Sequence, residues 1–138
     1  MKKVYLAGAI FGQSNAVCYD WRKHVTEKLS EWGAEALDPM RRDFRGKEAE
    51  SRDEIIRLDL IDIATCDVVF AFASVPSWGT AMELVYARVL HKPVIIWGVP
   101  EKFSPWLEFH CDVYTHTLDQ GLAELMLALE YRQNADIL

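Results

Sequence analysis

The sequence predicts an α/β fold, in which a doubly wound, mostly parallel five-stranded sheet of flavodoxin-like order carries helices on both faces. Short apolar runs rich in β-forming residues alternate with helical patterns along the whole chain. The first run is continuously apolar rather than alternating, which is typical of a strand covered on both faces. Because the chain has 138 residues, we expect one domain over residues 1–138.

The N-terminal part of the chain is predicted to form a strand, a helix and a second strand. Residues 3–7 (KVYLA) are a compact apolar run that ends at Gly8, and they predict the first strand. After a loop, apolar residues over 16–32 recur at the spacing of one helical face. They are Val17, Trp21, Val25, Leu29 and Trp32. Gly33 ends this helix, and residues 35–37 form a short second strand.

The remaining elements continue the alternation. A polar, charged loop over 40–51 precedes a helix over 52–65, which is apolar over much of its circumference. The run DVVFAFA over 67–73 predicts a central strand, and a helix over 80–90 leads to the strand PVIIW over 93–97. The last expected elements are a short helix or loop over 101–109, an edge strand over 112–115 and a closing helix over 118–132.

Charge and hydropathy argue against two classes of partner, nucleic acid polymers and membranes. Fifteen Lys and Arg residues face 21 Asp and Glu residues, for a net charge of −6, and no long basic run occurs. We therefore expect no binding to polymeric nucleic acid, which requires many neutralised phosphates. The basic residues cluster at Arg41, Arg42, Arg45 and Lys47, and this cluster fits either contact with one phosphate group or a solvated loop. No stretch is long and apolar enough to span a bilayer, so we expect no membrane partner.

Cysteine, histidine and glycine patterns argue against disulfides, metals and cofactors. Three cysteines without close pairs fit a reducing cytoplasm, where we expect the protein to reside. His110, Cys111 and Asp112 are neighbours on an expected strand and so point to opposite faces, which predicts no metal site. The loop from Gly8 to Gly12 lacks the dinucleotide-binding pattern, and we expect no cofactor. The short N-terminal apolar run fits a strand better than a signal peptide.

Open parallel sheets bind ligands beyond the carboxyl ends of their strands, so we expect the loops there to meet in one crevice. The candidate substrate-contacting residues in these loops and in the helix after the third strand are Gly8, Phe11, Asp38, Arg41, Ser77, Trp78, Gly79 and Met82. Phe11 and Trp78 are expected either to stack on a base and shield the site or to pack on the core as loop anchors.

The segment from Ser77 to Glu83 is the main candidate for chemistry. A serine at a helix start caps free amides, and a glutamate in the first turn is ordinarily a surface carboxylate favoured by the helix dipole. Here the helix begins at the expected crevice, and Gly79 and Ala81 leave room for a ligand. An ionised carboxylate there can attack a sugar carbon, as the nucleophile of retaining glycosyl transfer does.

Five segments, in this order and spacing, carry a family resemblance from the first strand through Val94. They are VYLAGAIFG (4–12), the helix with Trp21-Arg22, LDPMR (37–41), LDLIDIATCDVV (58–69) and GTAMELVYARVLHKPVI (79–95). Together they resemble the nucleoside 2-deoxyribosyltransferase family. The resemblance implies a doubly wound α/β fold and a homo-oligomer whose neighbouring subunits help to complete the sites. It also implies transfer of deoxyribose from a 2′-deoxynucleoside to another nucleobase.

The resemblance also implies roles for single residues. Glu83 would be the nucleophile, Tyr5 would hydrogen-bond and position it, and Asp59 would handle the proton of the nucleobase. The partners would be a small deoxynucleoside or deoxynucleotide and a free nucleobase. For the asparagine or aspartate that family members borrow from a neighbouring subunit, Asn134 and Asp136 are the candidates.

Ser77 departs from the pattern of many transferases, which have an acidic residue six positions before the nucleophile to grip the 5′-hydroxyl of the sugar. Relatives that hydrolyse nucleoside 5′-monophosphates resemble the chain here. A serine with helix-start amides suits an anion, and Arg41 or Arg42 would add positive charge. Two alternatives therefore stay open: a nucleoside 5′-monophosphate N-glycosidase, and a non-catalytic nucleotide-binding module on the same fold.

Overall fold

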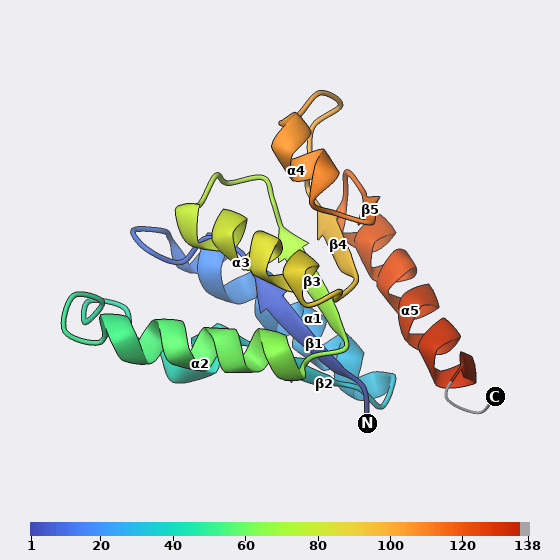
Figure 1. Cartoon of the computed structure of the whole chain (residues 1–138), viewed down its shortest axis with the longest axis horizontal. Helices are drawn as coiled ribbons and strands as arrows, with labels where there is room; N and C mark the ends of the chain where they lie inside the picture. Colours follow the sequence, from blue (N-terminus) through green and yellow to red (C-terminus); the bar gives the residue numbers. More distant parts are fainter. Residues whose placement is uncertain (136–138) are drawn as a thin grey trace.

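The structure, a computed structural model, describes the backbone of residues 1–135 and the side chains of residues 1–130. Asn134 and Asp136 lie outside the described side chains. Parallel strands form one five-stranded sheet in the order β2-β1-β3-β4-β5, which confirms the predicted doubly wound α/β architecture (Figure 1). The strands are β1 (Lys3–Ala7), β2 (Glu35–Leu37), β3 (Val68–Phe72), β4 (Val94–Trp97) and β5 (Val113–Tyr114).

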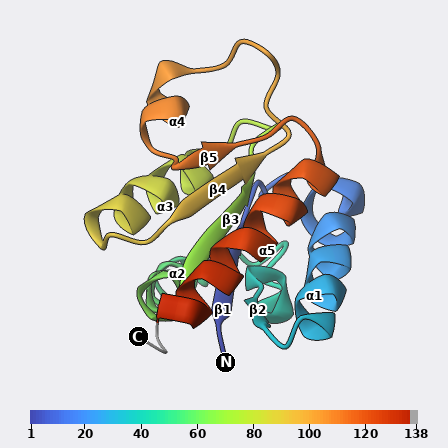
Figure 2. The ribbon, with the colours of Figure 1, turned by 90° about the vertical axis from the view of Figure 1, so that its right-hand side faces the viewer.

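Helices cover both faces of this sheet. One face packs against α1 (Trp21–Glu31) and α5 (Leu118–Ala135), and the other against α2 (Arg52–Thr65) and α3 (Trp78–Val89). Figure 2 shows α5 in front of the strands with α1 beside it. The short helix α4 (Pro105–Phe109) lies on the connection between β4 and β5. No helix in the described part of the chain has the length and hydropathy that a bilayer span requires.

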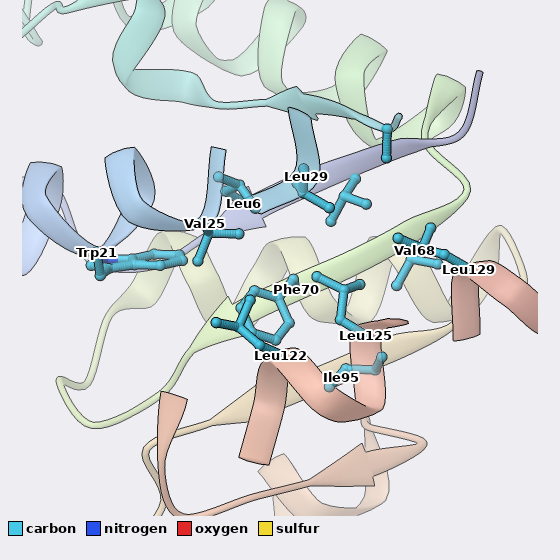
Figure 3. Close-up of a cluster of buried hydrophobic side chains, with 12 residues drawn as sticks. Leu6, Trp21, Val25, Leu29, Val68, Phe70, Ile95, Leu122, Leu125 and Leu129 are labelled. Atoms are coloured by element: carbon cyan, nitrogen blue, oxygen red, sulfur yellow. The ribbon is translucent and has the colours of Figure 1, made fainter. Parts of the chain in front are cut away.

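Strand periodicity divides the core of the protein into two layers. Along β1, Val4 and Leu6 point toward α1 and α5, whereas Tyr5 and Ala7 point toward α2 and α3. All four residues are buried. Figure 3 shows the layer under α1 and α5, which includes Leu6, Trp21, Val25, Phe70 and Leu125. The other layer brings the phenol of Tyr5 to the side of the sheet on which α3 lies.

Several element ends differ from the expectations. The predicted helix over 16–32 is divided into a π-helical turn, η1 (Ala16–Asp20), and α1. The predicted polar loop starts with a 3₁₀ turn, η2 (Pro39–Arg42), in which Asp38 Oδ1 accepts a hydrogen bond from the Met40 amide at 2.9 Å. Helix α3 begins at Trp78 rather than at residue 80, because Ser77 Oγ caps it by accepting from the Thr80 amide.

Candidate active site

A pocket of about 340 Å³ lies beyond the carboxyl ends of β1, β2 and β3, between η2 and α2 on one side and the start of α3 on the other. This is the crevice that the topology predicts. Its lining includes seven of the candidate residues, namely Gly8, Phe11, Asp59, Ser77, Gly79, Met82 and Glu83. A second hollow, of about 560 Å³ at the opposite end of the sheet, contains none of the candidates.

Glu83 lies one turn into α3 and borders the pocket. Its Oε2 is buried and has no hydrogen bond of good geometry with any described residue, although the residue as a whole keeps some exposure. Burial raises the pKa of Glu83 to about 8, hydrogen bonding with Tyr5 and the charge of Arg22 act to lower it, and the charge of Asp59 raises it. The side chain is therefore a carboxyl group held largely out of water at the border of the pocket, and this environment favours its neutral form.

Tyr5 approaches Glu83 from the sheet below. Burial raises the pKa of the phenol well above its ordinary value, and the charges of Glu83 and Asp59 raise it further. The phenol therefore stays neutral and can serve only as a donor to the carboxylate. Tyr5 Oη and Glu83 Oε2 influence each other's ionisation, yet within the described part of the chain neither atom has a hydrogen bond of good geometry. The Tyr5 hydroxyl and the Glu83 carboxyl oxygen are therefore buried, and each is still able to form a hydrogen bond.

Asp59 enters the pocket from α2. Arg42 Nη2 donates to its Oδ1 at 3.1 Å, and each of the two side chains is 20% exposed. Burial raises the pKa of Asp59, while the hydrogen bond and the charge from Arg42 oppose that shift. The site thus holds two carboxyl groups, and both have pKa values above their ordinary range.

Arg22 is the residue of the site that the sequence reasoning missed. Its fully buried guanidinium donates to three backbone carbonyls: Leu6 at 3.3 Å, Cys18 at 2.7 Å and Gly8 at 2.9 Å. Arg22 Nε also lies 3.4 Å from Asp38 Oδ1. Burial lowers the pKa of Arg22, and the charges of Asp38, Tyr5 and Glu83 oppose this. Arg22 fixes the loop that leaves β1 and places a positive charge behind the site.

Besides Tyr5, which approaches Glu83 from the sheet, three candidate residues do not line the pocket. Asp38 caps η2 and pairs with Arg22, which gives it a structural position. Arg41 points to Asp62 instead, and Arg41 Nη2 donates to Asp62 Oδ1 at 2.9 Å. Arg42, and not Arg41, lines the pocket. Trp78 is 85% exposed at the start of α3. It is therefore not packed on the core as a loop anchor.

The other candidates shape the mouth and the floor of the pocket. Phe11 and Met82 are 77% and 66% exposed, so their apolar surfaces stand at the entrance. A Cβ at Gly8 would lie 3.0 Å from the ring of Trp21, so this position is closely packed. At Gly79 a Cβ would lie 3.8 Å from Glu83 Oε1 and 3.9 Å from Ser77 Oγ. Gly79 thus keeps the space between Ser77 and Glu83 open for a ligand.

Comparison with known proteins gives a family and a fold. A family model described as nucleoside 2-deoxyribosyltransferase matches residues 4–122. The solved structure of a 2-deoxyribosyltransferase from Bacillus psychrosaccharolyticus is similar, with a TM-score of 0.62 and 24% identity over 81% of this chain and 84% of that one. A CMP N-glycosidase from Clostridium botulinum is similar with a TM-score of 0.61 and 24% identity, over 98% of this chain and 99% of that one. No curated protein sequence gives a significant match.

Proposed function

Because the chain belongs to the nucleoside 2-deoxyribosyltransferase family, we propose that it is an enzyme that cleaves the N-glycosidic bond of a 2′-deoxynucleoside and transfers the deoxyribose to another nucleobase. One observation carries this proposal: the buried carboxyl group of Glu83, next to the phenol of Tyr5, borders a pocket that also holds the carboxyl group of Asp59. Two carboxyl groups with separate environments are what retaining glycosyl transfer requires.

In the proposed mechanism Glu83 attacks C1′ of the sugar while the base departs. Asp59 supplies the proton that the departing base takes up. The bond from C1′ to the base nitrogen breaks as the bond from C1′ to the Glu83 oxygen forms, which leaves a deoxyribosyl ester. A second base then attacks C1′ from the opposite side, passes its N–H proton to the Asp59 carboxylate and releases Glu83 as a carboxylate, so two inversions retain the configuration. Tyr5 and the positive charge of Arg22 favour the ionised form of Glu83.

A nucleoside 5′-monophosphate N-glycosidase is the second candidate, and Ser77 favours it. Ser77 Oγ lines the pocket and accepts a hydrogen bond from the Thr80 amide at 3.2 Å, so its own proton is free for a ligand oxygen. Arg45 also lines the pocket and would attract an anion. In that reaction water would take the place of the acceptor base. A binding module without turnover is the third candidate.

We further propose that the enzyme works as a homo-oligomer with small-molecule substrates. Large apolar side chains remain exposed along one stripe of α3, starting at the pocket: Trp78, Met82, Val85 and Val89. Their spacing places them on one helical face. A second copy packed there would cover this stripe and exclude water from the entrance near Met82.

One incubation separates the three functions. The protein is mixed with deoxyinosine, deoxyinosine 5′-monophosphate and adenine, and the products are separated by chromatography. Deoxyadenosine indicates transfer, hypoxanthine without a new nucleoside indicates hydrolysis, and tight binding without products indicates a binding module. Faster loss of the monophosphate would favour the N-glycosidase.

Glu83→Ala should abolish cleavage and leave the protein folded, as checked by circular dichroism. The matched control is Glu27→Ala on the exposed face of α1, which should leave the rate unchanged. Unaltered cleavage by Glu83→Ala would contradict the mechanism.

A further inference from the structure

We propose that Arg42 is a positioning residue for Asp59, that Asp62 holds Arg42 in place, and that together they leave one oxygen of Asp59 to face the substrate base. This inference rests on the proposed function, because it explains how Asp59 would serve a departing base. Two features of the structure support it: the hydrogen bonds that Arg42 makes to Asp59 and Asp62, and the second oxygen of Asp59, which Arg42 does not contact.

The hydrogen bonds run between η2 and two successive turns of α2. Arg42 Nη2 donates to Asp62 Oδ2 at 2.8 Å and to Asp59 Oδ1 at 3.1 Å. Arg41 Nη2 donates to the second oxygen of Asp62, Oδ1, at 2.9 Å. Asp62 is nearly buried, and both of its oxygens are occupied by arginines. It therefore anchors η2 on α2 and fixes the place from which Arg42 reaches Asp59.

The consequence for Asp59 is a difference between its two oxygens. A guanidinium only donates hydrogen bonds, so Oδ1 is held as an acceptor and is a poor place for a proton. Asp59 Oδ2 has no hydrogen-bond partner among the described residues, and the side chain borders the pocket. A proton on Asp59 would therefore reside on Oδ2, where a base in the pocket can take it. Without Arg42 the carboxyl group could rotate and present either oxygen.

Charged and titratable groups surround Asp59 on every side, and Arg42 is the cation in direct contact with it. Arg22 faces it from α1, Glu83 from α3 and Tyr5 from β1, while Asp62 shares its helix. Of the two cations, only Arg42 donates a hydrogen bond to Asp59. Loss of Arg42 should consequently change the titration of Asp59 more than any other substitution of a cation nearby.

Titration of the Asp59 carboxyl carbon by NMR tests the positioning without any need for activity. We compare the wild type with Arg42→Met in protein labelled with ¹³C aspartate, and Asp59→Asn assigns the signal. The pKa of Asp59 should rise by roughly one unit or more in Arg42→Met, because an opposite charge in contact lowers a carboxyl pKa by about 1–3 units. The control is Arg52→Met, which removes an exposed arginine paired with Asp53 at the start of α2. An unchanged titration in Arg42→Met would overturn the inference.

Kinetics then separate positioning from a general structural role. Arg42→Met should lower kcat at least tenfold in the wild-type background and have little further effect in Asp59→Asn. An equal loss in both backgrounds would overturn the inference, because Arg42 would then act independently of Asp59. Should Arg42→Met fail to fold, Arg42→Lys takes its place, since it keeps the charge and loses the fixed planar fork. If the wild type cleaves no nucleoside, the proposed function fails, and the NMR titration still decides the positioning.

Discussion

The ionisation of Glu83 opposes the stability of the folded protein. Burial raises the pKa of this carboxyl to about 8 in the folded chain, against an ordinary value of 4.5. Between these two values the folded state binds the proton more tightly than the unfolded state does, so stability falls as pH rises through this window. The form with Glu83 ionised, which the proposed mechanism requires, is therefore the less stable form of the protein.

Glu83→Gln should remove this pH dependence. The free energy of unfolding should change little at pH 5 and increase by up to about 5 kcal/mol at pH 9, since each unit of pKa shift is worth about 1.4 kcal/mol. Urea denaturation at both values measures the difference. Glu27→Gln on α1 is the control for loss of an exposed carboxylate. A gain at pH 5 as large as that at pH 9 would show that the Glu83 carboxyl is not the source.

Tyr5→Phe removes the one side-chain hydrogen-bonding group that acts to lower the pKa of Glu83. The limb of the pH–rate profile on which activity rises with pH should move to higher pH, and kcat at pH 7 should fall roughly tenfold for each unit of that shift. Stability should stay within about 1 kcal/mol, because Tyr5 Oη is buried without a well-formed hydrogen bond. A lower kcat with an unmoved limb would mean that Tyr5 does not act through Glu83.

Strand periodicity makes part of this site predictable from the sequence. Tyr5 must lie on one face of β1 and Glu83 lies at the start of the helix beyond β3, so their approach follows once the sheet is parallel. Arg22 was not predictable in this way, because an arginine within a helical pattern ordinarily points to solvent. Its burial depends on the carbonyls of Leu6 in β1, Gly8 in the following loop and Cys18 in η1, and no single periodicity of the sequence shows that these three groups converge.

Among the helices and strands, the sequence predicted the alternation well and the element ends poorly. The π-helical turn η1 continues the same apolar spacing as α1, so the pattern alone cannot divide them. The structure shows what accompanies the turn: Trp21 Nε1 donates to the Val17 carbonyl at 2.8 Å and Arg22 Nη1 to the Cys18 carbonyl at 2.7 Å. Side chains of α1 thus satisfy carbonyls of η1, a tertiary arrangement that local propensity does not encode.

The packing of α5 on the sheet depends on Gly121. A Cβ at this position would lie 2.9 Å from Trp97 Cβ and 3.1 Å from Phe70 Cζ. Ordinary helix propensity favours alanine over glycine by about 1 kcal/mol. Overpacking typically costs about 1–3 kcal/mol. Gly121→Ala should therefore lower the free energy of unfolding in spite of the better helix former.

Chemical denaturation of two variants checks this prediction. Ala123→Gly, at an exposed position of the same helix, measures the propensity contribution alone and should destabilise by about 1 kcal/mol. If Gly121→Ala proves more stable than the wild type, α5 has shifted away from β3 and β4 to accept the methyl group.

For the whole molecule, the strand order determines where the site lies. Strand β1 sits between β2 and β3, and the connections from these neighbours leave toward α2 and α3 on the same face. The pocket therefore opens between two helices that only the complete sheet brings together. The exposed apolar stripe of α3 begins at the mouth of this pocket, so closure of the site and assembly of the molecule are expected to be coupled.

Val89→Asp tests that coupling at the end of the stripe far from the pocket. Val89 is 68% exposed and does not line the pocket, so the substitution leaves the site itself unchanged. A charge there should oppose burial against a second copy, because an unpaired carboxylate is costly to desolvate. Sedimentation velocity should show at least twice the mass of a single chain for the wild type and a smaller species for Val89→Asp. We expect kcat to fall at least tenfold with the loss of assembly, and the ratio of hydrolysis to transfer to increase as water enters.

His24→Asp, exposed on α1, is the matched control and should retain both mass and rate. If the wild type transfers deoxyribose as a monomer, closure of the site does not depend on assembly. The loops of the single chain would then exclude water from the pocket.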